Sequence, residues 1–165
     1  MSSLIRKLSI VTTLYRSMDT IDEFIQRALA AGEAVSNDIE IVIVDDGSPD
    51  GSANIVRNWV ERDARISLLC LSRNFGHHKA MLAGLEHAQG DLIFLIDSDL
   101  EEPPELLSEM AQVLRGKAVD CLYGLQERRK GGRMERISGH LFYWLFSALS
   151  EVRIPQNVST MRLMT

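Results

Sequence analysis

The feature that most constrains the fold is a regular alternation of apolar runs of strand length with segments whose apolar residues have helical spacing. Strands are expected at residues 8–14, 39–46, 66–72, 91–97 and 118–125. Helices are expected at residues 21–29, 53–63, 77–90 and 103–116, with Pro103 as a start signal and Gly90 and Gly116 as stop signals. Because apolar strands that alternate with helices form parallel sheets, the pattern predicts an α/β fold with a mostly parallel central sheet flanked by helices.

The length and composition limit what the chain can be. Residues 1–165 are expected to form a single domain, and a content of 45% hydrophobic and 25% charged residues is typical of a soluble globular protein. A net charge of −5 gives no attraction to nucleic acid, which is therefore not expected as a partner. Cys70 and Cys121 lack a ligand-like spacing, so buried free thiols are expected.

The compartment is indicated by the absence of two patterns in the sequence. The N-terminus lacks the apolar stretch of a signal peptide. No apolar run reaches the ~20 residues that a membrane-spanning helix needs. A cytoplasmic protein is therefore expected.

Polar and charged side chains gather where the expected strands end. The first strand runs into TTLYR, the second into DDGSPDG, the third into SRNFGHH and the fourth into DSDLEEPP. Parallel α/β sheets bind their ligands at the carboxyl ends of the strands, because the loops collect there. The sequence therefore predicts a binding site built from these loops.

The most acidic loop follows the fourth strand. Residues two apart in an extended chain face the same way, so Asp97 and Asp99 can point into one site. Like charges at that distance repel unless a cation lies between them, and Mg²⁺ or Mn²⁺ prefers oxygen ligands, so Asp97 and Asp99 are expected to hold such an ion. Glu101, Glu102 and Glu105 are better explained as acids that favour the positive N-terminal end of the next helix.

A second acidic pair, Asp45 and Asp46, ends the second strand. A carboxylate there can accept hydrogen bonds from a base N–H or from ribose hydroxyls. An Asx-type turn made by Asp-Gly-Ser is the structural alternative, and for this pair alone it would be the better explanation. Acidic residues at two strand ends of one sheet favour a binding role, because a turn needs only one such residue.

Several motifs follow one another along the chain: VTTLYR, IVIVDDGSPDGS, LSRNFGHHKAMLAGLEHAQGD, DSDLEEPPE, YGLQERRKG and LFYWLFSALSEVRIP. In their order and approximate spacing they make the chain resemble the family 2 glycosyltransferases of the GT-A fold, which is Rossmann-like. The similarity is greatest to the dolichyl-phosphate mannose synthase and bacterial polyprenyl-phosphate glycosyltransferase branch. It extends from about Leu8 to the end of the chain.

The resemblance implies roles for individual residues. Asp97 and Asp99 look like the family's metal-binding DxD motif and would act in catalysis through Mg²⁺ or Mn²⁺. The other residues implied in nucleotide-sugar binding are Thr13 and Tyr15 against the nucleotide, Asp46 at the base, and Arg73 near the base or the phosphates.

Lys79 follows His77 and His78 at the start of an expected helix. This group could neutralise the phosphates of a donor or face an acceptor phosphate. For His78, a polar start to the helix is the better explanation.

The resemblance also implies an activity. Family members transfer a sugar, with inversion, from a nucleotide diphosphate sugar to an acceptor; here the donor would be a UDP or GDP sugar and the acceptor a polyprenyl phosphate or glycan of the cell envelope. Residues 8–125 would form the nucleotide-sugar-binding core, and residues 126–165 a basic loop, an apolar helix and the beginning of the acceptor region. Because family members usually continue further, a truncated catalytic domain is expected.

One segment departs from the family's pattern. Where the polyprenyl-phosphate branch usually reads like DAGDFRL, this chain has NVSTMRLM at residues 157–164. Arg162 is kept, but Asn157 and Thr160 replace the two aspartates, so no general base is assigned. A phosphate acceptor that needs no base, a different acceptor, or a base beyond Thr165 would each explain the change.

The basic run at residues 127–136 precedes an apolar, aromatic segment. Arg128, Arg129 and Lys130, together with Arg162, would meet acceptor or donor phosphates, and the helix would contact the inner face of a membrane. Alternatively, the helix packs on the sheet after a solvated loop. The sequence leaves open whether the chain forms a homo-oligomer.

Two other functions compete with glycosyl transfer. An aspartyl phosphatase of the haloacid-dehalogenase type also has DxD after a strand, but it needs the motif on the first strand and Thr or Val where this chain has Glu101. A module of the same fold that binds a ligand or partner without turnover is the second alternative.

Overall fold

The computed structural model describes residues 7–117, 119–125 and 158–165. The chain divides into two compact units, one formed by residues 1–122 and 160–165 and the other by residues 123–159. The predicted basic loop and the apolar helix after it lie outside the described residues. The fold that carries the predicted strand-end loops is that of the first unit.

Strands and helices alternate as the sequence predicts. In chain order they are β1 (Leu8–Leu14), α1 (Ile21–Glu33), β2 (Ile39–Asp45), α2 (Ser52–Val60), β3 (Ile66–Cys70), α3 (His77–His87), β4 (Leu92–Leu95), α4 (Leu106–Gly116), β5 (Cys121–Leu125) and β6 (Val158–Met164). The predicted α/β class is confirmed. The strand β6 was not predicted, and α4 begins after Pro103 and not at it.

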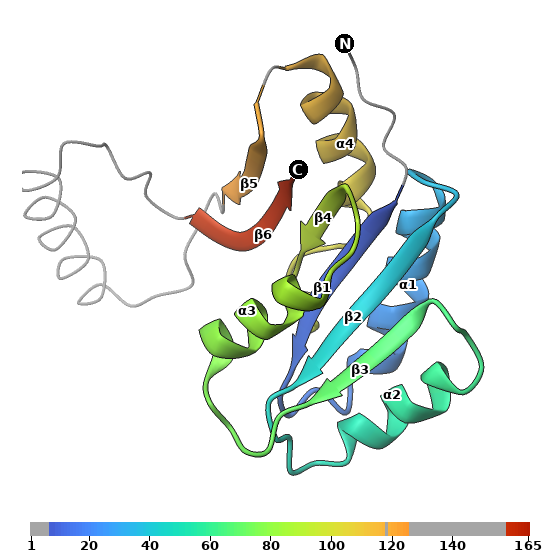
Figure 1. Ribbon diagram of the computed structural model, residues 1–165, viewed down its shortest axis with the longest axis vertical. Helices are drawn as coiled ribbons and strands as arrows, with labels where there is room; N and C mark the ends of the chain where they lie inside the picture. Colours follow the sequence, from blue (N-terminus) through green and yellow to red (C-terminus); the bar gives the residue numbers. More distant parts are fainter. Residues whose placement is uncertain (1–6, 118, 126–157) are drawn as a thin grey trace, which may run out of the picture. The chain divides into compact units, whose positions relative to one another are not determined.

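The sheet has the strand order β3-β2-β1-β4-β6-β5. Strands β3, β2, β1 and β4 are parallel, whereas β6 pairs antiparallel with β4 (Figure 1). After β3, the chain crosses back and places β4 on the other side of β1. Open α/β sheets bind their ligands where the strand order reverses, so the carboxyl ends of β1 and β4 mark the expected ligand site.

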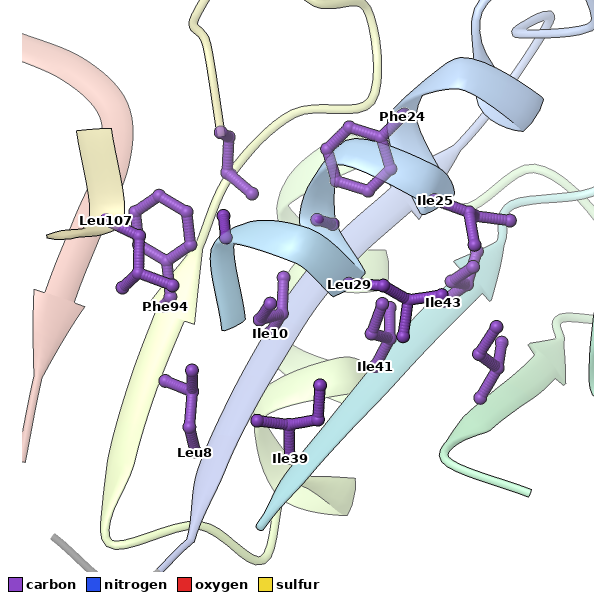
Figure 2. Close-up of a cluster of buried hydrophobic side chains, with 14 of the residues drawn as sticks. Leu8, Ile10, Phe24, Ile25, Leu29, Ile39, Ile41, Ile43, Phe94 and Leu107 are labelled. Atoms are coloured by element: carbon purple, nitrogen blue, oxygen red, sulfur yellow. The ribbon is translucent and has the colours of Figure 1, made fainter. Parts of the chain in front are cut away.

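Apolar side chains cover both faces of the sheet, which explains why the strands read as continuous apolar runs. The larger cluster joins one face to α1, α2 and α4, and Figure 2 shows Phe24 and Ile25 of α1 packed over Ile10, Ile41 and Ile43. The smaller cluster contains Val11, Val42 and Leu95, against which α3 packs. The result is a sheet with helices on both faces.

Helix α3 lies unusually close to the sheet at Gly84. A Cβ atom at this position would lie 2.6 Å from Cγ1 of Val11 and 3.0 Å from Cγ2 of Val44. Any larger residue would push the helix away from β1 and β2. The glycine therefore fixes the depth at which α3, and the residues at its start, sit on the sheet.

Gly90 was predicted to end α3, and this is wrong, because the helix ends at His87. A Cβ atom at Gly90 would lie 2.6 Å from the backbone nitrogen of Ser9. Gly90 is needed for this close approach and not as a stop signal.

The prediction that both cysteines are buried is also wrong: Cys70 and Cys121 are free, as predicted, but exposed. Cys70 is the last residue of β3, which lies at the edge of the sheet, and Cys121 is the first residue of β5. An apolar neighbourhood in the sequence does not ensure burial at the ends of peripheral strands. Among the described helices, none combines the length and apolar character needed to cross a membrane.

A polar cluster at the opposite end of the sheet from the predicted site is centred on Glu40. Its Oε1 accepts hydrogen bonds from Oγ of Ser9 (2.5 Å) and from the backbone nitrogen of Gln89 (2.6 Å). Its Oε2 lies 2.6 Å from Nζ of Lys7. Burial raises the pKa of Glu40, but the hydrogen bonds from Lys7, Ser9 and Gln89 together hold it below its usual range.

We expect Glu40→Gln to destabilise the fold by about 1–2 kcal/mol at neutral pH, because a charged acceptor of several hydrogen bonds is lost. Since the pKa is lowered in the folded state, this stability is present above the ordinary glutamate pKa and disappears as the pH falls through the lowered value. Thermal unfolding of both proteins should therefore converge in acid. Glu33→Gln, which removes an exposed ion pair with Arg65, is the control and should change stability by less than about 1 kcal/mol. A constant difference at all pH values would contradict the expectation.

Candidate active site

Strand alternation directs two of the predicted residues to the side of the sheet that α3 covers. Val11 of β1 and Leu95 of β4 belong to the apolar layer under α3. Thr13 lies two residues after Val11, and Asp97 lies two residues after Leu95, so both face the same side of the sheet as those residues. Because β1 and β4 are neighbouring parallel strands, Thr13 and Asp97 meet at the point where the strand order reverses.

His77, the first residue of α3, connects these two side chains. Its Nδ1 lies 3.0 Å from Oγ1 of Thr13, and its Nε2 lies 3.5 Å from Oδ1 of Asp97. The sequence places His77 near phosphates but not beside Asp97. The contact depends on the depth of α3 on the sheet, which no local pattern reveals.

The carboxylate of Asp97 lies in a partly buried and strongly charged environment. Burial raises its pKa, and the charges of Asp99 and Glu101 raise it further, whereas the charge of His77 and a hydrogen bond from the Thr160 side chain act in the opposite direction. The pKa of Asp97 is raised on balance. The charge of Asp99 thus acts on Asp97, and Thr160 of β6 is a neighbour to which the sequence assigned no contact.

The chain turns directly after β4, and hydrogen bonds fix this turn. Oδ1 of Asp99 accepts a hydrogen bond from the backbone nitrogen of Glu101 (2.9 Å). Oγ of Ser98, which is buried, donates to the carbonyl oxygen of Thr13 (2.8 Å). The serine between the two acids therefore anchors the DxD segment to β1.

Two residues near the strand-order reversal have left-handed backbone conformations. Arg16, after β1, has φ 55°, and Leu100, after β4, has φ 61°. Such conformations cost non-glycine residues about 1–3 kcal/mol each and persist only where the surroundings enforce them. Strained backbone in the loops after two neighbouring strands is typical of a functional site.

Asp50 holds the loop after β1 against the loop after β2. It accepts hydrogen bonds from Oγ of Ser48 (2.7 Å) and from the backbone nitrogens of Ser52 and Met18 (3.1 Å each). Oγ of Ser48 in turn accepts a hydrogen bond from the backbone nitrogen of Arg16 (2.7 Å). Burial raises the pKa of Asp50, but the hydrogen bonds from Ser52 and Ser48 outweigh this and hold it far below its usual range. The second half of DDGSPDG therefore has a structural role, since it holds the loops after β1 and β2 together.

The two acids at the end of β2 have different roles. Asp45 accepts a hydrogen bond from the backbone nitrogen of Ser48 (2.9 Å), which is the Asx-type turn considered from the sequence. Asp46 is 3% exposed and accepts hydrogen bonds from the backbone nitrogens of Phe75 (2.7 Å) and Gly76 (2.9 Å). Asp46 therefore fixes the loop before α3, and its contact with a nucleotide base stays a prediction.

The remaining predicted residues lie around this centre. The guanidinium of Arg73 stacks 4.2 Å from the ring centroid of Phe75, in the loop held by Asp46. Tyr15 is 42% exposed after β1, and Lys79 is exposed in the first turn of α3. Arg162 is exposed on β6, opposite Leu95 of β4.

Arg128, Arg129, Lys130 and Asn157 lie outside the described residues. Within residues 7–117, 119–125 and 158–165, no group of three or more His, Cys, Asp or Glu side chains is arranged to hold a metal ion. Glu105 forms the N-cap of α4, and both of its carboxylate oxygens lie 2.8 Å from the guanidinium of Arg27. Its side chain makes no capping hydrogen bond, so its carboxylate is held by Arg27 of α1, and an effect on the helix N-terminus stays a prediction.

A mostly parallel α/β sheet covered on both faces, with acidic and hydroxyl side chains at the carboxyl ends of its strands, is the arrangement of a Rossmann-like fold. Its structural neighbours are glycosyltransferases of the GT-A type. Residues 9–161 match the sequence profile of Glycosyl transferase family 2, and the chain belongs to this family.

Relatives with assigned names agree with this assignment. A Mycobacterium tuberculosis protein grouped with the glycosyltransferases is 44% identical over 96% of this chain and 46% of its own length. A prophage bactoprenol glucosyl transferase homolog of Escherichia coli is 33% identical over 96% of this chain and 52% of its own. The undecaprenyl-phosphate 4-deoxy-4-formamido-L-arabinose transferase of Edwardsiella ictaluri is 38% identical over 83% of this chain and 42% of its own. The chain thus spans about half the length of these curated relatives.

Solved structures share the fold at low sequence identity. The mannosyltransferase PcManGT from Pyrobaculum calidifontis, in complex with GDP-Man and Mn²⁺, has a TM-score of 0.65 at 18% identity and covers 99% of this chain and 45% of its own. Glucosyl-3-phosphoglycerate synthase from Mycobacterium tuberculosis, with Mn²⁺, UDP and glucosyl-3-phosphoglycerate, has a TM-score of 0.68 at 18% identity and covers 97% and 57%.

Proposed function

We propose that this chain binds a nucleotide diphosphate sugar at the carboxyl ends of β1, β2 and β4 and transfers the sugar to a polyprenyl phosphate with inversion. The observation that carries the proposal is the connected group of Thr13, His77 and Asp97 at the strand-order reversal, with Asp99 beside it. Membership of Glycosyl transferase family 2 supports the class of reaction.

Asp97 and Asp99 are proposed to hold a divalent ion, Mg²⁺ or Mn²⁺. Their carboxylate oxygens are the ligands that such ions prefer, and the charge of Asp99 raises the pKa of Asp97, a repulsion that a cation relieves. The side chain of Asp97 is 31% exposed and so accessible to a ligand. Mg²⁺ commonly takes one or two protein carboxylates and completes its shell with substrate phosphates and water. When bound, the ion supplies Lewis-acid stabilisation of the departing diphosphate.

The nucleotide is proposed to lie across the loops after β1, β2 and β3. Tyr15 and the Arg73–Phe75 pair offer exposed aromatic and cationic surface for a base, and Asp46 holds the loop that carries that pair. Lys79, in the first turn of α3, is proposed to neutralise the donor phosphates. UDP and GDP sugars are the proposed donors, since structural neighbours have been solved with UDP and with GDP-Man.

The acceptor is proposed to be a polyprenyl phosphate, since one relative is named as an undecaprenyl-phosphate 4-deoxy-4-formamido-L-arabinose transferase. In a single displacement, the acceptor phosphate oxygen bonds to the anomeric carbon from the face opposite the breaking bond to the nucleoside diphosphate, and the configuration inverts. A phosphate oxygen is already anionic, so no residue needs to remove a proton. Thr160 near Asp97, where the related branch has an acid, is consistent with this.

Arg162 and the residues Arg128, Arg129 and Lys130, which lie outside the described part, are proposed to attract the acceptor phosphate. An acceptor of this kind is anchored in a lipid bilayer. The chain would therefore act in the cytoplasm, at the inner face of the membrane, in the synthesis of cell-envelope polysaccharide.

Two measurements test this function. Calorimetric titration with UDP, GDP and dTDP, each with and without Mn²⁺, should show metal-dependent binding of one nucleotide. The corresponding sugar donor, mixed with undecaprenyl phosphate in detergent, should then give a glycosyl phosphate of inverted anomeric configuration by NMR. Nucleotide binding without transfer or donor hydrolysis would indicate the non-catalytic module, and no binding of any nucleotide would contradict the donor site.

A further inference from the structure

We propose that His77 is a positioning residue that orients the carboxylate of Asp97 for metal binding. In this arrangement Thr13 donates a hydrogen bond to His77, and His77 directs its own N–H toward Asp97. The proposal rests on the proposed function, because it assigns a role to a neighbour of the expected metal ligand. It adds a residue to the site, and it predicts which nitrogen of the imidazole carries the hydrogen.

The contacts of the ring determine that direction. Nε2 of His77 lies 3.5 Å from Oδ1 of Asp97, and Nδ1 lies 3.0 Å from Oγ1 of Thr13. The contact with Asp97 is longer than an ordinary N–H···O hydrogen bond, but an ionised carboxylate only accepts, so we propose that the nitrogen that faces it carries the hydrogen. Nδ1 of the neutral ring is then an acceptor, and the hydroxyl of Thr13 donates to it. The chain of donors runs from Thr13 through His77 to Asp97.

The carboxylate of Asp97 is held from two elements at once. His77 approaches it from α3, and the side chain of Thr160 donates a hydrogen bond to it from β6. Because Asp97 follows the last residue of β4 by only two positions, it has no helix or strand of its own to fix it. Neighbouring side chains must therefore set the orientation of this carboxylate.

The backbone around His77 is anchored by packing and by a hydrogen bond. It is the first residue of α3, and Gly84 of the same helix allows α3 to lie directly against Val11 and Val44. Asp46, the residue after β2, accepts a hydrogen bond from the backbone nitrogen of Gly76, immediately before His77. The ring is thus held on a packed helix and next to an anchored loop, as a residue that orients a metal ligand needs to be.

Substitutions at His77 separate its two contacts. In His77→Gln, the amide nitrogen can reach the position of Nε2 and still donate to Asp97, whereas in the shorter His77→Asn it reaches only that of Nδ1. Hydrogen-bond partners of metal ligands typically contribute 10-fold to 100-fold to metal affinity. We expect His77→Asn to weaken Mn²⁺ binding by about that factor, and His77→Gln to restore most of it.

The affinity is measured by electron paramagnetic resonance of free Mn²⁺, once with saturating UDP and once with saturating GDP. His78→Asn is the matched control, since it makes the same change one residue further along α3, and it should bind Mn²⁺ as the unmodified chain does. Thermal unfolding of each variant without metal shows whether the fold is intact. Asp99→Ala serves as the reference for a lost metal site.

The outcomes separate the inference from the proposed function. Loss of Mn²⁺ affinity in Asp99→Ala but none in His77→Asn would overturn the role of His77 and leave the metal site standing. An equal loss of Mn²⁺ affinity in His77→Asn and His77→Gln would also overturn the role of His77, because the distance that the side chain can reach toward Asp97 would then have no effect. Mn²⁺ binding that is weak in the unmodified chain and unchanged in Asp99→Ala would overturn both proposals.

A second measurement needs neither metal nor substrate. Long-range ¹H–¹⁵N correlation spectra of the metal-free chain report which imidazole nitrogen is protonated, and His77→Gln identifies the signal of His77. We expect hydrogen on Nε2 and none on Nδ1. Hydrogen on Nδ1 would overturn the proposed direction of the hydrogen-bond chain, even if Mn²⁺ binding behaved as expected.

Discussion

Replacing Asp99 with alanine is expected to reduce sugar transfer by about 1,000-fold or more and to abolish metal-dependent nucleotide binding. Lewis-acid stabilisation of a leaving group contributes several kcal/mol, and each 1.36 kcal/mol corresponds to a factor of ten in rate. The fold should survive, because Asp99 is exposed and its side chain accepts a hydrogen bond from the backbone nitrogen of Glu101 in a surface turn. Initial rates of transfer and calorimetric nucleotide binding, with and without Mn²⁺, measure the two effects.

Two variants make this result specific. Asp99→Asn can still accept the hydrogen bond from Glu101, so it isolates the loss of charge from the loss of the turn. Asp91→Asn changes an aspartate just before β4, where it accepts a hydrogen bond from the backbone nitrogen of Lys7, and should leave transfer unchanged. Full activity of Asp99→Asn would show that the charge is not needed and would contradict the metal site.

Phe94→Ala is expected to be the most destabilising single substitution in this core, at about 3–5 kcal/mol. Phe94 is completely buried in the middle of β4, among the side chains of the larger apolar cluster (Figure 2). Domains are typically stable by about 5–15 kcal/mol, so the variant should be partly unfolded under mild conditions. Urea denaturation, monitored by circular dichroism, measures the change.

The control for this substitution is Leu82→Ala. Leu82 lies on α3 and is 59% exposed, so its truncation should change stability by about 0.5 kcal/mol or less. Because β4 leads directly into Asp97 and Asp99, Phe94→Ala should also lose activity when it unfolds. Similar unfolding midpoints for Phe94→Ala and Leu82→Ala would show that the core is not organised around β4.

The fold could be predicted from the sequence because its strands are apolar on both faces and its helices have helical spacing. Both signals are local, and they gave the α/β class and the loops that carry polar residues. The role of Gly90 as a helix stop and the burial of Cys70 were predicted incorrectly, because both depend on neighbours that are distant in the sequence. Ser9 approaches Gly90 from β1, and Cys70 lies at the end of an edge strand.

The candidate site was predictable only in part. Asp97 and Asp99 stand out as acids two positions apart after a strand, and Thr13 lies at the end of another. The contacts of His77 and Thr160 with Asp97 depend on how α3 and β6 pack beside β4, and no pattern around either residue indicates this. The residues that orient a site are harder to find than those that act in it, because their contacts come from tertiary structure.

The position of β6 has a consequence for folding during synthesis. β4 pairs with β1 on one side and with β6, which comes much later in the chain, on the other. A ribosome that has just released β4 therefore exposes a strand with one unpaired edge, and such edges readily pair with other chains. Asp97 likewise lacks its hydrogen bond from Thr160 until β6 has been synthesised. Slow translation between β4 and β6 should accordingly favour aggregation, and the nascent chain should gain the contact between Thr160 and Asp97 only when β6 has emerged.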